Sequence, residues 1–243
     1  MIRQSRLPPI FRLHPIDAGI DVAAEAIRFA DCGGDPATVI CAEREDVLDC
    51  AVVLHPETDL NDAMLVMYVA ALGLGDALGA VVPAGIDMTF RWPNIIEANL
   101  GSVARLDLLI PDDAAGTEIP DWIAARVTTQ VGELDGDWRD GAFPETSLFG
   151  EGCVEVTSSQ LLESFARHFL TWLNRWQQDG FDPIRAMWLR HARSQGAEID
   201  LTTATGRHQG VFSNIGDDGA IELENGEHVG LRDALEALRG KCT

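Results

Sequence analysis

Basic residues are scarce in this sequence, and their scarcity narrows the range of expected partners. Among 243 residues, 18 Lys and Arg stand against 39 Asp and Glu, which gives a formal net charge of −21. A surface this acidic repels phosphate backbones and anionic lipids, so neither nucleic acid nor a membrane is an expected partner. The charge also has a simpler explanation, which is that it keeps a cytoplasmic protein soluble.

The cysteine and histidine patterns of metal or redox sites are missing as well. The five cysteines, at positions 32, 41, 50, 153 and 242, form no C-x-x-C pair, and one is left over in any pairing scheme. We therefore expect small buried thiols in a reducing cytoplasm and no metal site. The chain also lacks H-E-x-x-H, G-x-S-x-G, P-loop and G-x-G-x-x-G sequences, so none of the corresponding chemistries is indicated.

Long apolar segments are absent too. The first residues carry charge and two prolines before any apolar run, so no signal peptide is expected. The longest apolar run, 63–75, is bounded by Asp62 and Asp76 and is too short to cross a bilayer. It predicts a buried core helix over 61–79. With 46% hydrophobic residues, the chain has enough apolar side chains for one large core and a small satellite domain.

The order of the predicted elements indicates an α/β or α+β domain, followed by a smaller β domain. Residues 1–16, which hold three prolines, are expected to form an extended arm. Helices are predicted over 17–30, 61–79, 157–178 and 183–191, and strands over 38–42, 51–54, 88–92, 102–110 and 122–134. From residue 197 short strands alternate with glycine turns, which predicts a small SH3-like barrel. The predicted domains are therefore 1–196 and 197–243.

Residues 88–111, MTFRWPNIIEANLGSVARLDLLIP, are the most informative stretch. An alternating apolar strand stops at Trp92-Pro93-Asn94, where proline removes a backbone donor and the chain must turn. In the following strand, one face is wholly apolar and is expected to pack on the helices. The opposite face is predicted to line the open side of the sheet. It carries Val103, Arg105, Asp107 and Leu109.

Arg105 and Asp107 stand two residues apart on that predicted open face. In a strand, side chains at this spacing lie on the same side and are close enough to pair. Two interpretations are open. The pair lines a ligand cleft, or it is an ion pair on a solvated sheet surface, where such pairs contribute little to stability.

Two strands joined through W-P-N resemble the central hairpin of the biotin and lipoate protein ligase superfamily. Three further features occur in the order found in biotin ligases: the segment PETSL at 144–148, a long helix with a DGF turn and a short Trp-bearing helix, and the GAIEL texture near 219–223. The resemblance spans roughly residues 17–235. It implies a class II synthetase-like domain with a mixed sheet, helices and a C-terminal SH3-like barrel. The activity it implies is ATP-dependent acyl-adenylate formation, with ATP and Mg²⁺ as cofactors, and transfer to a lysine of a carrier domain.

The resemblance also implies a set of site residues. Arg91 stands where the family has a lysine before W-P-N, Asn94 is retained, and a second family lysine falls at Ser102; these are the candidate catalytic residues. The candidate ligand-binding residues are Asp21, where the family holds the ligand head group, and Trp92, Arg105 and Asp107. Other interpretations are open. They are a surface position for Arg91, a packing role for Trp92 and a turn role for Asn94.

Three positions depart from the family pattern. Strand 38–42 is followed by a short acidic segment in place of the Gly- and Arg-rich loop that covers the acyl-adenylate, the family Asp is Ile95, and the second lysine is Ser102. Removing one such donor lowers the rate by about two to three orders of magnitude. The sequence thus predicts a ligase-like protein with impaired or altered activity. The alternatives are a non-catalytic protein that binds a small carboxylate or a partner segment, and an acidic interaction module that recognises through its barrel.

The charges of Arg105 and Asp107 bear on the ligand itself. If both lie under an aliphatic chain, their desolvation costs several kcal/mol. We therefore expect neither biotin nor lipoate to bind with micromolar affinity, and we expect a small ligand that carries polar or charged groups.

Overall fold

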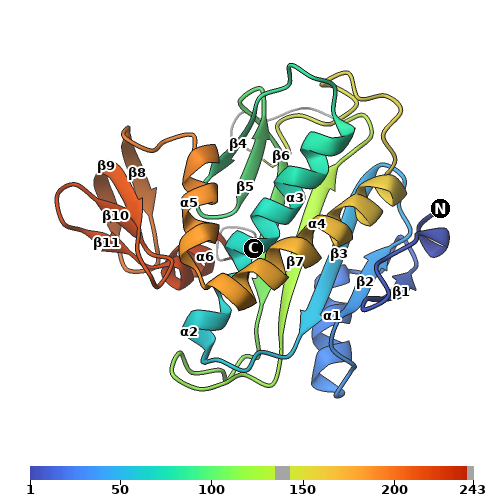
Figure 1. The fold of residues 1–243 in the computed structure, drawn as a ribbon, viewed down its shortest axis with the longest axis horizontal. Coiled ribbons are helices and arrows are strands. Elements are labelled where there is room, and N and C mark those ends of the chain that lie inside the picture. The colour runs from blue at the N-terminus through green and yellow to red at the C-terminus, as the bar shows by residue number, and fades with distance from the viewer. Residues whose placement is uncertain (135–142, 240–243) are drawn as a thin grey trace.

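The fold is described by a computed structural model, which covers residues 1–134 and 143–239 of the chain (Figure 1). Its centre is a seven-stranded sheet with strand order β1-β2-β3-β7-β6-β5-β4. The pair β1 and β2 is parallel and the other neighbours are antiparallel, so the sheet is mixed, as predicted. The strands are β1 (Arg12–Ile16), β2 (Thr38–Ala42), β3 (Val47–Leu54), β4 (Met88–Arg91), β5 (Ile95–Ala98), β6 (Gly101–Leu109) and β7 (Ile123–Gln130).

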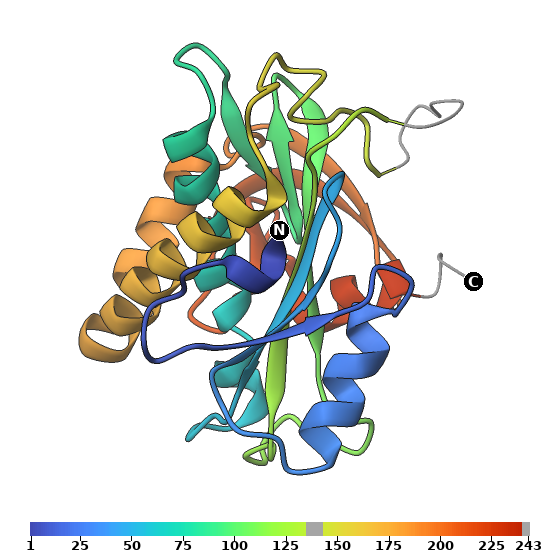
Figure 2. The same ribbon diagram turned by 90° about the vertical axis from the view of Figure 1, so that its right-hand side faces the viewer.

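Helices cover the two faces of this sheet unequally. Figure 2 shows α3, α4 and α5 on one side of the sheet and α1 on the other. The first group packs on the even-numbered residues of β6, Ala104, Leu106 and Leu108, which confirms the predicted apolar face. Helix α1 packs on β2, β3 and the ends of β6 and β7. It covers only this part of the second face of the sheet. The helices are α1 (Val22–Asp31), α2 (Leu60–Ala63), α3 (Val66–Val81), α4 (Ser158–Asp179) and α5 (Asp182–His191).

The N-terminal predictions need three corrections. Residues 1–16 are more than an arm, because they hold a short 3-10 helix (Ile2–Gln4) and the edge strand β1. The first helix starts at Val22 instead of residue 17, since the Asp21 carboxylate accepts the Ala24 N–H at 2.7 Å and caps the helix there. Strand β3 begins at Val47 instead of residue 51, so residues 43–46 are the whole connection from β2.

The apolar helix predicted over 61–79 is present as α2 and α3, with a break at Met64 and Leu65. Segment Leu60–Val81 is long and apolar enough to cross a membrane by length and composition alone, but 72% of its most apolar window is buried inside the protein. Tyr68 and Leu74, for example, are almost completely buried. The segment is therefore the central core helix of the fold.

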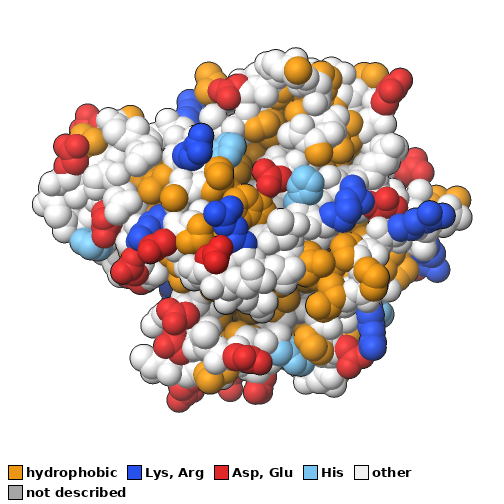
Figure 3. Space-filling model, in the orientation of Figure 1, with side chains coloured by type: hydrophobic (Ala, Val, Ile, Leu, Met, Phe, Trp, Pro, Cys, Tyr) orange, Lys and Arg blue, Asp and Glu red, His pale blue; other side chains and the backbone are white. Residues whose placement is uncertain are grey.

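The amphipathic helix predicted over 157–178 is present as α4, one residue further along the chain at each end. Thr157 and Gln160 form both hydrogen bonds of a capping box at the start of α4. Figure 3 shows the face that this helix helps to cover, where the basic side chains are scattered among acidic and apolar ones.

The C-terminal part forms a second sheet, as the change of texture at residue 197 predicted. Its strands are antiparallel in the order β11-β10-β9-β8, and α6 follows them. Phe212, Ile215 and Ile221 from this sheet belong to the same apolar core as α3 and α4. Division into domains at 196/197 and closure into an SH3-like barrel stay predictions, and Cys242 lies outside the described residues. These elements are β8 (Glu198–Thr202), β9 (Arg207–Ile215), β10 (Ile221–Leu223), β11 (His228–Val229) and α6 (Leu231–Arg239).

Candidate functional site

A cavity of about 1110 Å³ lies between the large sheet and the C-terminal sheet. One wall comes from the W-P-N turn and the exposed face of β6 and β7. The other comes from β8, β9, β10 and α6, and the side of α1 closes one edge. Its size is at the upper end of the range of small-molecule sites. The cavity brings together five of the seven predicted site residues, namely Arg91, Trp92, Asn94, Arg105 and Asp107.

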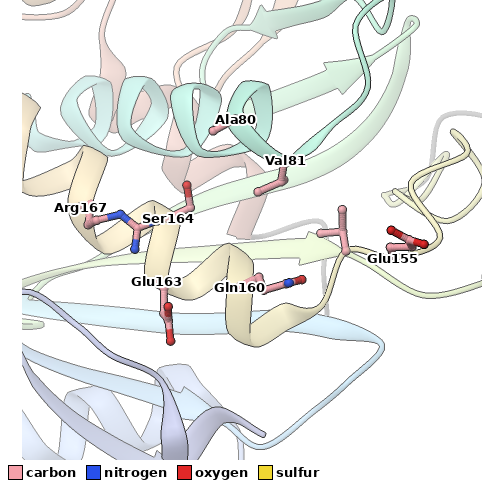
Figure 4. A pocket seen from close by; sticks show the side chains of 8 residues that line it. Ala80, Val81, Glu155, Gln160, Glu163, Ser164 and Arg167 are labelled. Atoms are coloured by element: carbon pink, nitrogen blue, oxygen red, sulfur yellow. The ribbon is translucent and has the colours of Figure 1, made fainter.

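A second hollow, of about 390 Å³, lies between the end of α3 and the start of α4 (Figure 4). Gln160, Glu163, Ser164 and Arg167 are the residues of α4 that line it. The Glu163 carboxylate already accepts the backbone N–H of Arg6 at 2.7 Å. This hollow lies away from every predicted site residue, so the candidate site is the larger cavity.

Trp92 joins the W-P-N turn to both α3 and the C-terminal sheet. Its indole N–H donates to the Tyr68 hydroxyl at 2.8 Å, and that hydroxyl donates to the Gly219 carbonyl at 2.5 Å. Burial raises the pKa of Tyr68, so the phenol stays protonated and keeps its donor. The indole N–H of Trp92 therefore has a packing role, as one of the two interpretations expected. Trp92 is also among the residues that line the cavity.

Asn94 holds the turn against the next strand. Its side-chain amide donates to the Leu106 carbonyl at 2.9 Å, and its own carbonyl accepts the Leu106 N–H at 2.9 Å. The side chain is buried in the structure. These bonds explain why an asparagine follows the proline, since it fixes the turn. A catalytic role of Asn94 stays a prediction.

Arg91 is held by a carboxylate that the sequence analysis did not select. The Glu97 side chain is fully buried, and its Oε1 lies 3.1 Å from Arg91 Nε and 2.8 Å from Arg193 Nη1. The second carboxylate oxygen accepts the Thr89 hydroxyl at 3.3 Å. A buried carboxylate needs a paired cation, and here two arginines meet it from the β4 end and from the segment after α5. Arg91 is thus more than an isolated surface side chain.

Ser102 reaches its place through a β-bulge. Strands β5 and β6 pair Ile96 with Ala104 but Glu97 with Ser102, so Val103 is an extra residue in β6. The bulge reverses the side-chain alternation, and Ser102 lies on the face that carries Glu97. Val103 instead packs in the helical core with no exposed surface. The prediction that Val103 lines the open face is therefore wrong.

The segment that follows residue 143 covers Ser102 and forms hydrogen bonds with it. The Ser102 carbonyl accepts the N–H groups of Glu145 and Thr146 at 2.8 and 3.1 Å, and its hydroxyl accepts the Glu145 N–H at 3.1 Å. Its own N–H donates to the Glu145 carboxylate at 2.9 Å. With 1% of its surface exposed, Ser102 is a structural junction, and its hydroxyl is not available to replace a cationic side chain.

The open face of β6 and β7 carries a charged array. Arg105 and Asp107 are 3.2 Å apart and both line the cavity. On the adjacent strand, Arg126 makes two hydrogen bonds of 2.8 Å to Asp49 of β3. Those bonds and the nearby Asp107 outweigh burial and raise the pKa of Arg126, so its charge is fixed. The location is the one expected for Arg105 and Asp107; their role in binding stays a prediction.

Thr128 lies at the centre of this array. The strand register places it directly between Arg105 on β6 and Asp49 on β3. Its hydroxyl is buried and has no hydrogen-bond partner among the residues that the structure describes. Arg105 uses only Nε for Asp107, and its guanidinium lies over the Phe143 ring, 5.1 Å from the centroid. The terminal nitrogens of Arg105 therefore have no hydrogen-bond partner among the described residues.

Asp21 does not join the group. Its carboxylate caps α1, and the cavity edge there is formed by Ala23 and Ile27 instead. Its predicted contact with a ligand head group has no support from these positions. Sequence reasoning missed Arg126 and Thr128, although both lie within the strand predicted over 122–134. Sequence reasoning also missed Glu97 and Arg193, because no motif or spacing near either residue indicates that the two side chains meet.

Two family features are absent from the site. Strands β2 and β3 are joined by residues 43–46 alone, and Arg44 in that turn pairs with Asp46. The sequence has a single lysine, Lys241, which lies outside the described residues. Among the described residues, no group of three His, Cys, Asp or Glu side chains is placed to hold a metal ion. All described cations of the cavity are therefore arginines.

The mixed sheet, its helical layer and the cavity behind the W-P-N turn define the fold of a biotin ligase catalytic domain. The chain belongs to the biotin/lipoate A/B protein ligase family, whose model matches residues 7–190.

Three relatives illustrate the similarity. A biotin–[acetyl-CoA-carboxylase] ligase of Paracoccus denitrificans is 32% identical over 173 residues, which is 71% of each chain. The structure of a biotin protein ligase-like protein of unknown function from Silicibacter sp. has a TM-score of 0.85 and 29% identity, and it covers 96% of this chain and 99% of that one. The Aquifex aeolicus biotin protein ligase in complex with biotin and ATP has a TM-score of 0.73 at 15% identity, covering 92% and 97%, and shares the fold.

Proposed function

We propose that this protein binds a small acid in the cavity, with the anionic group held by Arg105, and that acyl-adenylate formation is impaired or altered. The observation that carries the proposal is the floor of the cavity. There, Arg105 uses only Nε for Asp107, and its terminal nitrogens have no hydrogen-bond partner among the described residues. Guanidinium forks match carboxylates in geometry and charge. A carboxylate placed there accepts from the terminal nitrogens of Arg105.

The same floor disfavours an apolar ligand chain. Arg105 and Asp107 have 30% and 26% of their side-chain surface exposed, and that exposed part faces the cavity. Covering them with methylene groups removes their remaining water and offers no hydrogen bond in return. Neither biotin nor lipoate is therefore proposed as the ligand, although biotin is bound by the Aquifex relative.

Impaired chemistry is supported by the cations that are missing. Ser102 is buried where the family lysine was expected, the turn at 43–46 cannot cover an adenylate, and no described residue is a lysine. Adenylate formation develops charge on phosphate oxygens, and fixed cations stabilise that charge. The buried free thiols of Cys41 and Cys50 agree with a reducing, cytoplasmic location, which is part of the proposal.

A working ligase is the second candidate function. It is favoured by the Paracoccus relative, whose name is that of a biotin ligase. It is also favoured by the retained W-P-N turn with Arg91 at the preceding position. In this case the protein uses ATP and Mg²⁺, and a biotinyl or lipoyl carrier domain is its acceptor.

Two measurements separate the candidates. Calorimetry with biotin, lipoate and a series of short polar carboxylates compares the natural protein with Arg105→Gln. Loss of one charged hydrogen-bonding group weakens binding by roughly 10–100-fold. Arg190→Gln is the matched control, because it removes the same charge from an exposed helical position outside the cavity.

The outcomes are distinct. The proposal expects a polar carboxylate to bind, with loss of affinity in Arg105→Gln and no change in Arg190→Gln. It also expects no acid-dependent release of pyrophosphate from ATP. Micromolar binding of biotin with adenylate formation establishes the ligase instead. Equal affinity of a polar carboxylate for the natural protein and Arg105→Gln overturns the proposed site.

A further inference from the structure

We propose that the ligand of the cavity is a zwitterion, an α-amino acid with an apolar side chain, and that Asp107 binds its ammonium group. This inference rests on the proposed function, in which Arg105 holds the carboxylate of a small acid, and it names the class of that acid. The two side chains lie on the same face of β6, and Arg105 Nε is 3.2 Å from Oδ2 of Asp107. Both line the cavity, so a cation and an anion are presented to the ligand side by side.

Asp107 has an open acceptor. Its Oδ2 receives Arg105 Nε, and its Oδ1 has no hydrogen-bond partner among the described residues. Arg126 stands opposite Asp107 in the strand register, but its Nε and Nη2 both donate to Asp49 at 2.8 Å. Within the same part of the chain, the terminal nitrogens of Arg105 are also unused. The pair on β6 therefore offers open donors and an open acceptor next to each other.

A ligand that carries a carboxylate alone satisfies only one half of this pair. Asp107 has 26% of its side-chain surface exposed, and a group that covers Arg105 at this distance also removes water from Asp107. A carboxylate that loses water and gains no donor is destabilised. An ammonium group replaces that water with a charge-assisted hydrogen bond. In an α-amino acid both charged groups are attached to one carbon, so their short separation matches that of Arg105 and Asp107.

The charges around the cavity are balanced, which favours a ligand without net charge. Three arginines and three aspartates line it: Arg91, Arg105, Arg126, Asp107, Asp112 and Asp200. Three of the six are also paired with residues outside the lining, namely Arg91 with Glu97, Arg126 with Asp49 and Asp200 with Arg207. The whole chain carries a formal charge of −21. A simple anion is thus repelled at long range and meets no excess of positive charge in the cavity, whereas a zwitterion has no net charge.

The wall that faces the charged strands is apolar, and it defines the side chain of the ligand. The C-terminal sheet and α6 contribute Ile199, Leu201, Phe212, Ile221 and Leu238 to this wall. When the ammonium and carboxylate groups lie on β6, the side chain of an amino acid extends away from them toward the other wall. Burial of an apolar side chain there adds affinity. L-Leucine and L-phenylalanine are therefore suitable probes.

Calorimetric titration with these two amino acids and their matched analogues tests the inference. For leucine, 4-methylpentanoate lacks the ammonium group and 3-methylbutylamine lacks the carboxylate; for phenylalanine, the analogues are 3-phenylpropanoate and 2-phenylethylamine. We expect at least one of the two amino acids to bind the natural protein roughly tenfold or more tightly than either of its analogues, since each analogue has lost one charged hydrogen-bonding group. In 6-aminohexanoate the charged groups are far apart, and it is expected to bind as weakly as the analogues.

Variants of the two charged residues assign the contacts. Asp107→Asn is expected to weaken binding of the amino acid about tenfold or more and to leave the affinity for the analogue without ammonium within about twofold. Retained binding of that analogue also shows that the variant is folded. Arg105→Gln is expected to weaken binding of both. Asp121→Asn is the matched control, because it removes the same charge from an exposed position outside the cavity, and its affinities are expected to stay unchanged.

The outcomes separate this inference from the proposed function. If 4-methylpentanoate and 3-phenylpropanoate bind as tightly as the amino acids, and Arg105→Gln weakens that binding, the zwitterion is wrong and the carboxylate site stands. Unchanged affinity of the amino acid for Asp107→Asn also overturns the inference and leaves the carboxylate site in place. Absence of binding by every acid tested, at millimolar concentration, overturns both.

Discussion

The hydroxyl of Tyr68 is the perturbation with the clearest structural consequence. Tyr68 is the only tyrosine of the chain, it is buried in α3, and its hydroxyl is the single link between the Trp92 indole and the Gly219 carbonyl. Tyr68→Phe deletes that link and leaves the ring in place. It therefore tests whether this hydroxyl holds the W-P-N turn and the C-terminal sheet on the core.

The magnitude follows from what the deletion leaves behind. An indole N–H and a carbonyl both lose their partner, and an unpaired buried polar group costs roughly 1–3 kcal/mol. The two together predict a loss of about 2–4 kcal/mol, which is a large part of the 5–15 kcal/mol typical of a domain. For a chain of this length, each kcal/mol lowers Tm by roughly 2–4 °C, so the expected shift is about 5–15 °C.

Thermal and urea unfolding, followed by circular dichroism, measure this shift, and Thr129→Val is the control. Thr129 is fully buried in β7, and its hydroxyl has no partner among the described residues. Removing that hydroxyl at constant shape is expected to leave stability unchanged or to raise it by up to about 1 kcal/mol. If Tyr68→Phe and Thr129→Val behave alike, the two hydrogen bonds of Tyr68 do not contribute as argued.

Three further predictions rest on the same part of the molecule. Because burial raises the pKa of Tyr68 above the ordinary value of about 10, the unfolded state loses the phenol proton first. Stability then falls as the pH rises above about 10, and absorbance at 295 nm should show phenolate only as the protein unfolds. Glu97→Gln is expected to lower stability by roughly 1–3 kcal/mol in urea titrations, since two arginines lose their shared anion. Ser102→Lys is expected to lower Tm without producing adenylate, because the sealed position has no room for the longer side chain.

The sequence was sufficient for most of the elements, though not for β1 and β5, and for the apolar side of the sheet. Capping residues and strong helical periodicity predicted α4 to within one or two residues, and glycine turns predicted the second sheet. The even face of β6 was also predicted correctly, because its alternation is uninterrupted from Ala104 to Leu108. These features depend on local pattern, which a single sequence contains.

Other features were not predictable, because they depend on pairing between distant strands. Strand β5 was overlooked, since its four residues have no turn signal that separates them from the W-P-N segment. The bulge at Val103 is defined only by its partner strand, so alternation placed this residue on the wrong face. The cluster of Arg91, Glu97 and Arg193 joins positions that are about a hundred residues apart, and no spacing within the sequence indicates it.

The bulge also shows why a family position cannot be equated with a family function in this chain. It turns Ser102 toward the face where a catalytic lysine is useful, so the backbone still presents that position to the site. The space around it is nevertheless filled by the backbone of residues 145–146, which takes every polar group of Ser102 into hydrogen bonds. Cations remain nearby, at Arg91, which lines the cavity, and at Arg193, and both are paired with Glu97. The chain thus has the fold of the family, while the described arginines that line its cavity lie at the end of β4 and on the open face of β6 and β7.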